Sequence, residues 1–144
     1  MLDERFLSHT TVAIAQSRRV VNSMAYLVKK NLADAAAVLD SYSEEQYRDA
    51  ADTEDLIDKY EDKLGTYLIK ISAKQLSKTQ NEELYNFLHT ITDLERISDH
   101  ALNLSNSAKE IHEKNISFSE DARHELTVLR AAVKEITDIA IDAF

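Results

Sequence analysis

The chain contains one glycine, Gly65, and no proline among its 144 residues. Tight hairpin turns and the glycine-rich loops of dinucleotide-binding sheets both depend on residues that accept unusual backbone angles. The near absence of such residues argues against an all-β fold and against a Rossmann-type sheet. We therefore predict an all-α protein, and at this length a single domain with a buried core.

Apolar side chains recur along the chain at alternating spacings of three and four residues, which is the period of an amphipathic helix. Polar segments interrupt this period three times, so the sequence predicts four helices. The predicted boundaries are a first helix over about 2–40, a second after the capping box of Ser43 and Gln46, a third from Asn81 as N-cap to about Lys114, and a fourth after Ser117 or Ser119, with Asn115 as a left-handed cap.

Short connections between long helices favour antiparallel neighbours. The predicted fold is thus an all-α, up-and-down antiparallel helical bundle, with one domain over 1–144 that divides into three helices over 1–115 and a fourth helix over 116–144. Gly65 lies inside the second predicted helix, where glycine costs about 1 kcal/mol relative to alanine. We expect it to permit the close approach of a neighbouring helix.

Acidic residues outnumber basic ones by 26 to 17, which gives a formal net charge of −9. This balance argues against nucleic acid or anionic lipid as the main ligand and favours cations or a basic protein surface. The chain has no cysteine, so disulfides and thiolate metal sites are excluded. It also has no apolar run of about 18 residues. We therefore expect a soluble chain without direct membrane insertion.

Seven of the acids fall in fourteen residues between Asp49 and Asp62, against one base, Lys59. A solvated acidic face is the ordinary interpretation of such a run. Extending the apolar stripe of the second helix backwards by three and four residues, however, leads to Glu61 and Glu54. Acids therefore occur on or beside the side of this helix that should face the core.

Two E-x-x-x-D pairs occur in the chain, Glu54 with Asp58 on the second predicted helix and Glu95 with Asp99 on the third. Residues spaced i,i+4 share a helix face, and counting from the intervening turn puts the two pairs at nearly one level. Four carboxylates so placed need protonation, a basic partner or a bound cation. Oxygen ligands suit iron, zinc, manganese or magnesium.

Catalytic arrangements find little support in the sequence. No glutamate has a histidine three residues later, as ferritin-like di-iron sites require, and no H-E-x-x-H motif occurs. His100 follows Asp99 and is either an edge ligand or an ordinary surface histidine. A slender bundle also offers no cleft for glycoside or metal-assisted hydrolysis. We predict that the protein is not an enzyme.

The segment 92–101 resembles the D-L-E-R-I-G-D-H-A motif of PhoU-type domains, and 54–58 resembles their helix-two E-x-x-x-D motif. The opening residues 2–7 are similar to the sequence that follows the membrane segments in bacterial Na/Pi cotransporter-like proteins. Ser98 stands where the family commonly has glycine. The resemblance implies a three-helix repeat over 1–115, with 116–144 as the start of a truncated second repeat.

The resemblance also implies a metal site, because family members bind multinuclear iron or zinc clusters on these carboxylate motifs; magnesium and manganese stay open as alternatives. The implied ligands are Glu54, Asp58, Glu95 and Asp99, with Asp55, Asp62 and Asp93 as auxiliary ligands.

The function that the resemblance implies is that of a regulatory domain on the cytoplasmic side of the inner membrane, acting in the control of phosphate uptake and homeostasis. Its implied partner is the membrane-embedded transporter portion of the parent protein, and a homo-oligomer is left open. The alternative hypothesis is a structural helical interaction module without metal, whose acids are solvated or bind basic partner surfaces.

Overall fold

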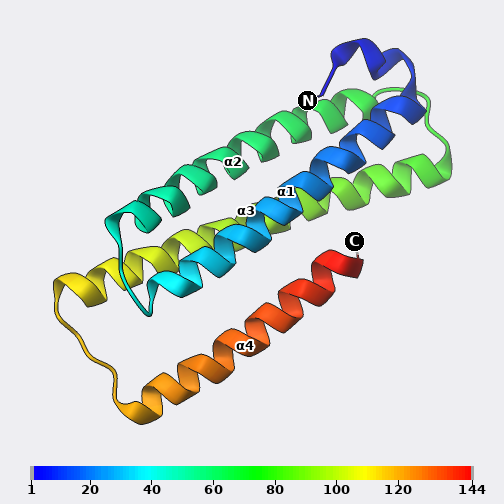
Figure 1. Cartoon of the computed structure of the whole chain (residues 1–144). Helices are drawn as coiled ribbons and strands as arrows, with labels where there is room; N and C mark the ends of the chain where they lie inside the picture. Colours follow the sequence, from blue (N-terminus) through cyan, green and yellow to red (C-terminus); the bar gives the residue numbers. More distant parts are fainter. Residues whose placement is uncertain (1, 144) are drawn as a thin grey trace.

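The computed structural model describes residues 2–143, and within them it contains helices and no strands. Three long helices pack side by side in antiparallel order, and a fourth lies along one side of them (Figure 1). The all-α bundle predicted from the sequence is confirmed. The elements are the 3₁₀ helix η1 (Glu4–Ser8), α1 (Thr10–Val38), α2 (Glu44–Ser72), α3 (Lys78–Glu113) and α4 (Glu120–Ala143).

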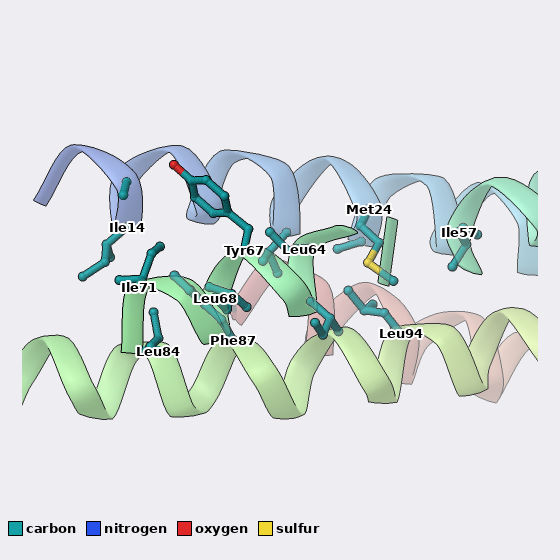
Figure 2. Close-up of a cluster of buried hydrophobic side chains, with 14 of the residues drawn as sticks. Ile14, Met24, Ile57, Leu64, Tyr67, Leu68, Ile71, Leu84, Phe87 and Leu94 are labelled. Atoms are coloured by element: carbon teal, nitrogen blue, oxygen red, sulfur yellow. The ribbon is translucent and has the colours of Figure 1, made fainter. Parts of the chain in front are cut away.

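The core lies between α1, α2 and α3, where apolar side chains from each helix meet (Figure 2). The predicted stripe of α2 is fully buried, and it faces Met24 on α1 and Ile91 on α3. Each fully buried aliphatic side chain contributes about 1.5–3 kcal/mol relative to an exposed one. The stripe residues of α2 are Ile57, Leu64, Leu68 and Ile71.

The helix ends follow the predicted capping residues at α2 and depart from them at α3. Ser43 caps α2 by accepting a hydrogen bond from the Gln46 amide at 3.3 Å. At α3 the cap is Ser77 and not Asn81, because Ser77 and Gln80 form a reciprocal capping box. That pairing gives two free backbone amides a hydrogen-bond partner at once. The helix therefore starts about one turn closer to the N-terminus than predicted.

The predicted C-terminal cap of α3 and one of the two predicted caps of α4 are both present. Asn115 has a φ of 51°, the left-handed conformation expected just after a helix. Ser119, rather than Ser117, caps α4 by accepting a hydrogen bond from the Ala122 amide at 3.2 Å.

The predicted start of the first helix, at about residue 2, is wrong. The 3₁₀ helix η1 and a break at His9 precede α1, which begins at Thr10. Asp3 caps η1 and pairs with Arg5, and the Tyr67 hydroxyl donates a hydrogen bond to the Asp3 carbonyl at 3.0 Å. The N-terminal segment is therefore fastened to α2. Apolar period alone could not show this, because the period continues across the break.

Gly65 lies in the middle of α2, and it is not required by a close backbone contact. A Cβ atom built there would meet only the Ile91 Cδ1 atom, at 3.7 Å, which is ordinary van der Waals distance. We expect Gly65→Ala to raise the free energy of unfolding by about 0.5–1 kcal/mol, because alanine has the higher helix propensity. Urea unfolding followed by circular dichroism checks this. A destabilised variant would show that α2 and α3 need the glycine to approach each other.

Helix α4 differs from the other three because none of its residues is buried. It packs against α1 alone, where Lys29 pairs with Asp138 at 2.9 Å and Arg130 pairs with Asp40 at 2.6 Å. Ile141 of α4 is half-buried against the core, whereas the large side chains Leu129, Val133 and Ile136 of the predicted apolar stripe are exposed. α4 is therefore an amphipathic helix on which most of the large apolar side chains stay exposed within the described residues.

Candidate metal centre

Acidic side chains from α2 and α3 meet at one level on the outside of the bundle. Burial is the first cause that raises the pKa of Glu54, and the charge of Asp99 on the neighbouring helix is the second. Burial likewise raises the pKa of Glu95, followed by the charges of Asp99, Glu61 and Asp58. Because each glutamate is affected by acids of the opposite helix, the two E-x-x-x-D pairs form one electrostatic cluster.

This acidic cluster, defined as Glu54, Asp58, Glu61, Glu95 and Asp99, has no basic partner. None of its members enters an ion pair with lysine or arginine anywhere in residues 2–143. A hydroxyl supplies one contact, since the Thr92 Oγ1 atom donates to the Glu61 Oε1 atom at 3.3 Å. The negative charge of the cluster is thus left uncompensated by the chain itself.

The layer beneath the acidic cluster is apolar, and this explains why burial is the first cause of both pKa shifts. Ile57 of α2 and Leu94 of α3 are buried in the core, in the part drawn on the right of Figure 2. Glu54 lies three residues before Ile57, and Glu95 directly follows Leu94. Both glutamates are half-buried. Apolar neighbours remove water from one side of each carboxylate, which disfavours its charged form.

The structure brings together the four predicted principal ligands but only one of the three auxiliary ones. Asp55 is exposed and acts on Glu54. Asp62 instead lines a groove between α1 and α2. Asp93 is exposed and lies two residues before Glu95, about 200° around the helix from it, so it faces away from the cluster.

Glu61 belongs to the acidic cluster although it was not among the predicted ligands. It is half-buried and acts on Glu95 across the interface. Its position one turn before the buried Leu64 was the available signal, since it continues the apolar stripe of α2. Glu61, which continues the apolar stripe of α2, is therefore a better candidate ligand than its exposed neighbour Asp62.

Ser98, which stands where the resembling family commonly has glycine, is buried between α3 and α1. Its hydroxyl accepts a hydrogen bond from the Asn31 Nδ2 atom at 3.3 Å, and Asn31 is itself buried. A small residue is needed here because two helices approach, and the hydroxyl gives the buried amide a partner. The substitution is therefore accommodated one residue away from Asp99 without disturbing the acidic cluster.

The donor atoms of the acidic cluster suit a hard or borderline cation. Five carboxylates without a counter-charge match the oxygen ligands that iron, manganese, magnesium and, with fewer ligands, zinc accept. As they stand, no three histidine or acidic side chains within residues 2–143 are arranged so that they could hold an ion together. The chemistry of the donors fits a cation, whereas their positions in this structure do not converge on one ion.

The raised pKa values of Glu54 and Glu95 predict a pH dependence for the metal-free protein. A carboxyl with a higher pKa in the folded state binds protons more tightly there. Stability is then greatest below the unfolded value, about 4.3, and falls as the pH rises through the folded value. We expect Glu54→Gln/Glu95→Gln to remove this fall and to stabilise the protein at pH 7 by no more than about 1 kcal/mol, because the groups are only half-buried.

Urea unfolding at pH 4 and pH 7, with a chelator present, measures this difference. Asp62→Asn/Asp93→Asn is the matched control, because it removes two exposed acids that lie outside the cluster. A glutamine variant less stable than the parent chain at pH 7 would contradict the proposed repulsion.

Comparison with known proteins gives a family but no individual relative. The sequence profile of the PhoU domain matches residues 21–108, which is 88 of the 144 residues. Neither a curated protein nor a solved structure shows significant similarity to the chain. The matched segment begins in α1, contains all of α2, and ends near the end of α3, so it includes both E-x-x-x-D pairs. Since this match covers more than half of the sequence, the chain belongs to the PhoU domain family.

Proposed function

We propose that this chain is a metal-binding regulatory domain in the control of phosphate uptake. Its family is one of helical regulatory domains of phosphate homeostasis, which supports the regulatory part. The acidic cluster supports the metal part: burial, and then the charges of neighbouring acids on both helices, raise the pKa of the half-buried Glu54 and Glu95. No ion pair with lysine or arginine in residues 2–143 offsets these charges. A bound cation would supply the missing positive charge.

Glu54, Asp58, Glu95 and Asp99 are the residues that would hold the metal, with Glu61 and Asp55 beside them. The metal would link α2 to α3 at the middle of the bundle, where the two helices otherwise repel each other through these acids. Iron and zinc are proposed first, as one ion or as a multinuclear cluster, and manganese or magnesium second. The availability of metal in the cell would then determine how often this site is occupied, and metal binding would make the pair of α2 and α3 more rigid.

Isothermal titration calorimetry of the metal-free protein with Fe²⁺, Zn²⁺, Mn²⁺ and Mg²⁺ tests the metal part. We expect saturable binding of at least one ion, weakened at least about 100-fold in Glu95→Ala/Asp99→Ala, since half of the principal ligands are lost. Asp62→Ala/Asp93→Ala removes the same charge outside the cluster and should bind as the parent chain does. Equal binding by all three proteins would contradict the assignment of the site.

We further propose that the domain acts on the membrane-embedded transporter portion of a Na/Pi cotransporter-like parent, from the cytoplasmic side of the inner membrane. No helix within residues 2–143 has the length and apolarity that a bilayer-spanning segment needs. The similarity of residues 2–7 to the sequence after such membrane segments supports this parent. Labelled-phosphate uptake by cells whose own gene carries Glu95→Ala/Asp99→Ala should differ from that of the parent strain. Uptake that is identical at low and high external phosphate would contradict the regulatory role.

The alternative is a helical interaction module that binds no metal. The uncovered apolar face of α4 favours an interaction role, although it does not bear on the acidic cluster. This alternative predicts that chelators leave the melting temperature unchanged and that loss of the four acids stabilises the bundle by relieving their repulsion.

A further inference from the structure

A pocket of about 640 Å³ lies at the end of the bundle where α3 leads into α4. Its walls come from the end of α1, the end of α3, the connection between α3 and α4, and the first half of α4 (Figure 1). Pockets that hold small organic molecules measure about 300–1,000 Å³, so this one has the size of a ligand site. The residues of this α3–α4 pocket that decide its chemistry are Asp40, Tyr42, Ile111, Ile116, Arg123 and Arg130.

The α3–α4 pocket is lined by two arginines and one acid. Arg123 enters no ion pair within residues 2–143. Arg130 pairs with Asp40, but its Nη1 atom alone donates to both carboxylate oxygens, at 2.7 and 2.6 Å. The Nε and Nη2 donors of Arg130 are not used in that pair. Two guanidinium groups against one carboxylate therefore make this pocket locally positive, in a chain whose formal net charge is −9.

The polar groups of the pocket suit a phosphate group better than a carboxylate. Arg123 and Arg130 lie two turns apart on one side of α4, about 10 Å along the helix axis, and Asn115 and Ser117 add neutral polar side chains from the connection. A guanidinium donates parallel hydrogen bonds to oxyanions of either kind. A phosphate monoester, however, offers three terminal oxygens and about two negative charges, whereas a carboxylate offers two oxygens and one charge. The larger number of donors and the two cations thus match the phosphate.

The rest of the wall is apolar and aromatic. Ile111, Ile116 and Leu126 line it, together with the ring of Tyr42. That ring stacks on His112, which also lines the pocket, with 4.8 Å between the centroids and 25° between the planes. Inorganic phosphate would leave these side chains in water, whereas the organic body of an ester would cover them. The wall therefore favours an organic phosphate over the free ion.

We propose that the α3–α4 pocket binds a phosphate monoester with an aromatic body, of the size of a nucleoside monophosphate. The phosphate group contacts Arg123 and the remaining donors of Arg130, and the aromatic body packs against Ile111 and Ile116. Such a ligand touches α1, α3 and α4 at once, so it strengthens the attachment of α4, which packs against α1 alone. No member of the acidic cluster lines the pocket, and the proposal does not depend on metal binding.

Isothermal titration calorimetry of the metal-free protein with four compounds tests the ligand class. The two esters are AMP and phenyl phosphate, and the two comparison compounds are adenosine and inorganic phosphate. We expect saturable binding of at least one ester, and binding at least about tenfold weaker for both comparison compounds, because each lacks one half of the ligand. The proposal is overturned if neither ester binds, or if adenosine or inorganic phosphate binds as tightly as the esters do.

Arg123→Ala then tests the place of binding. Arg123 is exposed and enters no ion pair, so its removal breaks none, and circular dichroism should show the helix content of the parent chain. We expect this variant to bind the ester at least about tenfold more weakly, because a charge-assisted hydrogen bond to the phosphate is lost. Arg19→Ala is the matched control, since Arg19 is exposed on α1 and does not line the pocket. Equal ester binding by Arg123→Ala and the parent chain would overturn the assignment of the pocket.

Discussion

Saturating metal is expected to raise the melting temperature of this protein by about 8–11 °C. A ligand present at 100 times its dissociation constant stabilises the folded state by about 2.7 kcal/mol. For a chain of this size, 1 kcal/mol corresponds to about 3–4 °C. Bound metal is expected to stabilise the folded state by more than the repulsion among the acids destabilises it, because the cation supplies the counter-charge that α2 and α3 lack.

The same experiment separates the acidic cluster from the rest of the acidic surface. Glu95→Ala/Asp99→Ala should melt at the same temperature with and without metal, while Asp62→Ala/Asp93→Ala should show the full rise. The rise should also disappear as the pH falls towards 4, because protons compete with the metal for the carboxylates. A rise of equal size in both double variants would mean that the metal binds elsewhere.

The second large effect is expected in the core, where Leu64→Ala should lower the free energy of unfolding by about 3 kcal/mol. Leu64 is fully buried on α2 between α1 and α3, and truncation leaves a cavity that packed helices cannot close. The melting temperature should fall by about 10 °C.

Leu129→Ala is the matched control, because it removes the same atoms from a leucine that is 60% exposed on α4. Its effect should stay within about 0.5 kcal/mol. A Leu129→Ala variant as unstable as Leu64→Ala would show that α4 is part of the core and not an uncovered helix.

Local signals in the sequence predicted the helices well and their starting points less well. The period of three and four residues predicted all four helices, and single polar residues fixed the caps at Ser43 and Asn115. The start of α3 was misplaced because Asn81 and Ser77 are both good caps. Ser77 and Gln80 have the same S-x-x-Q spacing as Ser43 and Gln46, so the signal for the correct cap was present in the sequence, and the reciprocal bonds of the structure confirm it.

The acidic cluster was predictable in outline because helical spacing and the length of a hairpin are nearly fixed quantities. Counting residues from the turn was enough to bring Glu54 and Asp58 opposite Glu95 and Asp99. The prediction of the auxiliary ligands depended on the direction in which each side chain leaves the helix. Neighbours in sequence differ by about 100° around a helix, so Glu61 faces α3 whereas Asp62 faces α1.

The packing of α4 could not be predicted from its sequence. An amphipathic stripe shows that a helix has one apolar face, but it does not show which surface covers that face. In this chain the stripe that includes Leu129 and Ile136 turns away from the core, and ion pairs hold the opposite side of the helix to α1. Only the arrangement in space distinguishes a core helix from one whose apolar side chains stay exposed.

The central claim is that the acids shared by α2 and α3 form a metal site, and the metal content of the purified protein tests it most directly. Inductively coupled plasma mass spectrometry should find iron or zinc at one or more atoms per chain in the parent protein and in Asp62→Ala/Asp93→Ala, and almost none in Glu95→Ala/Asp99→Ala. Negligible metal in all three proteins, or the same metal content in all three, would contradict the claim.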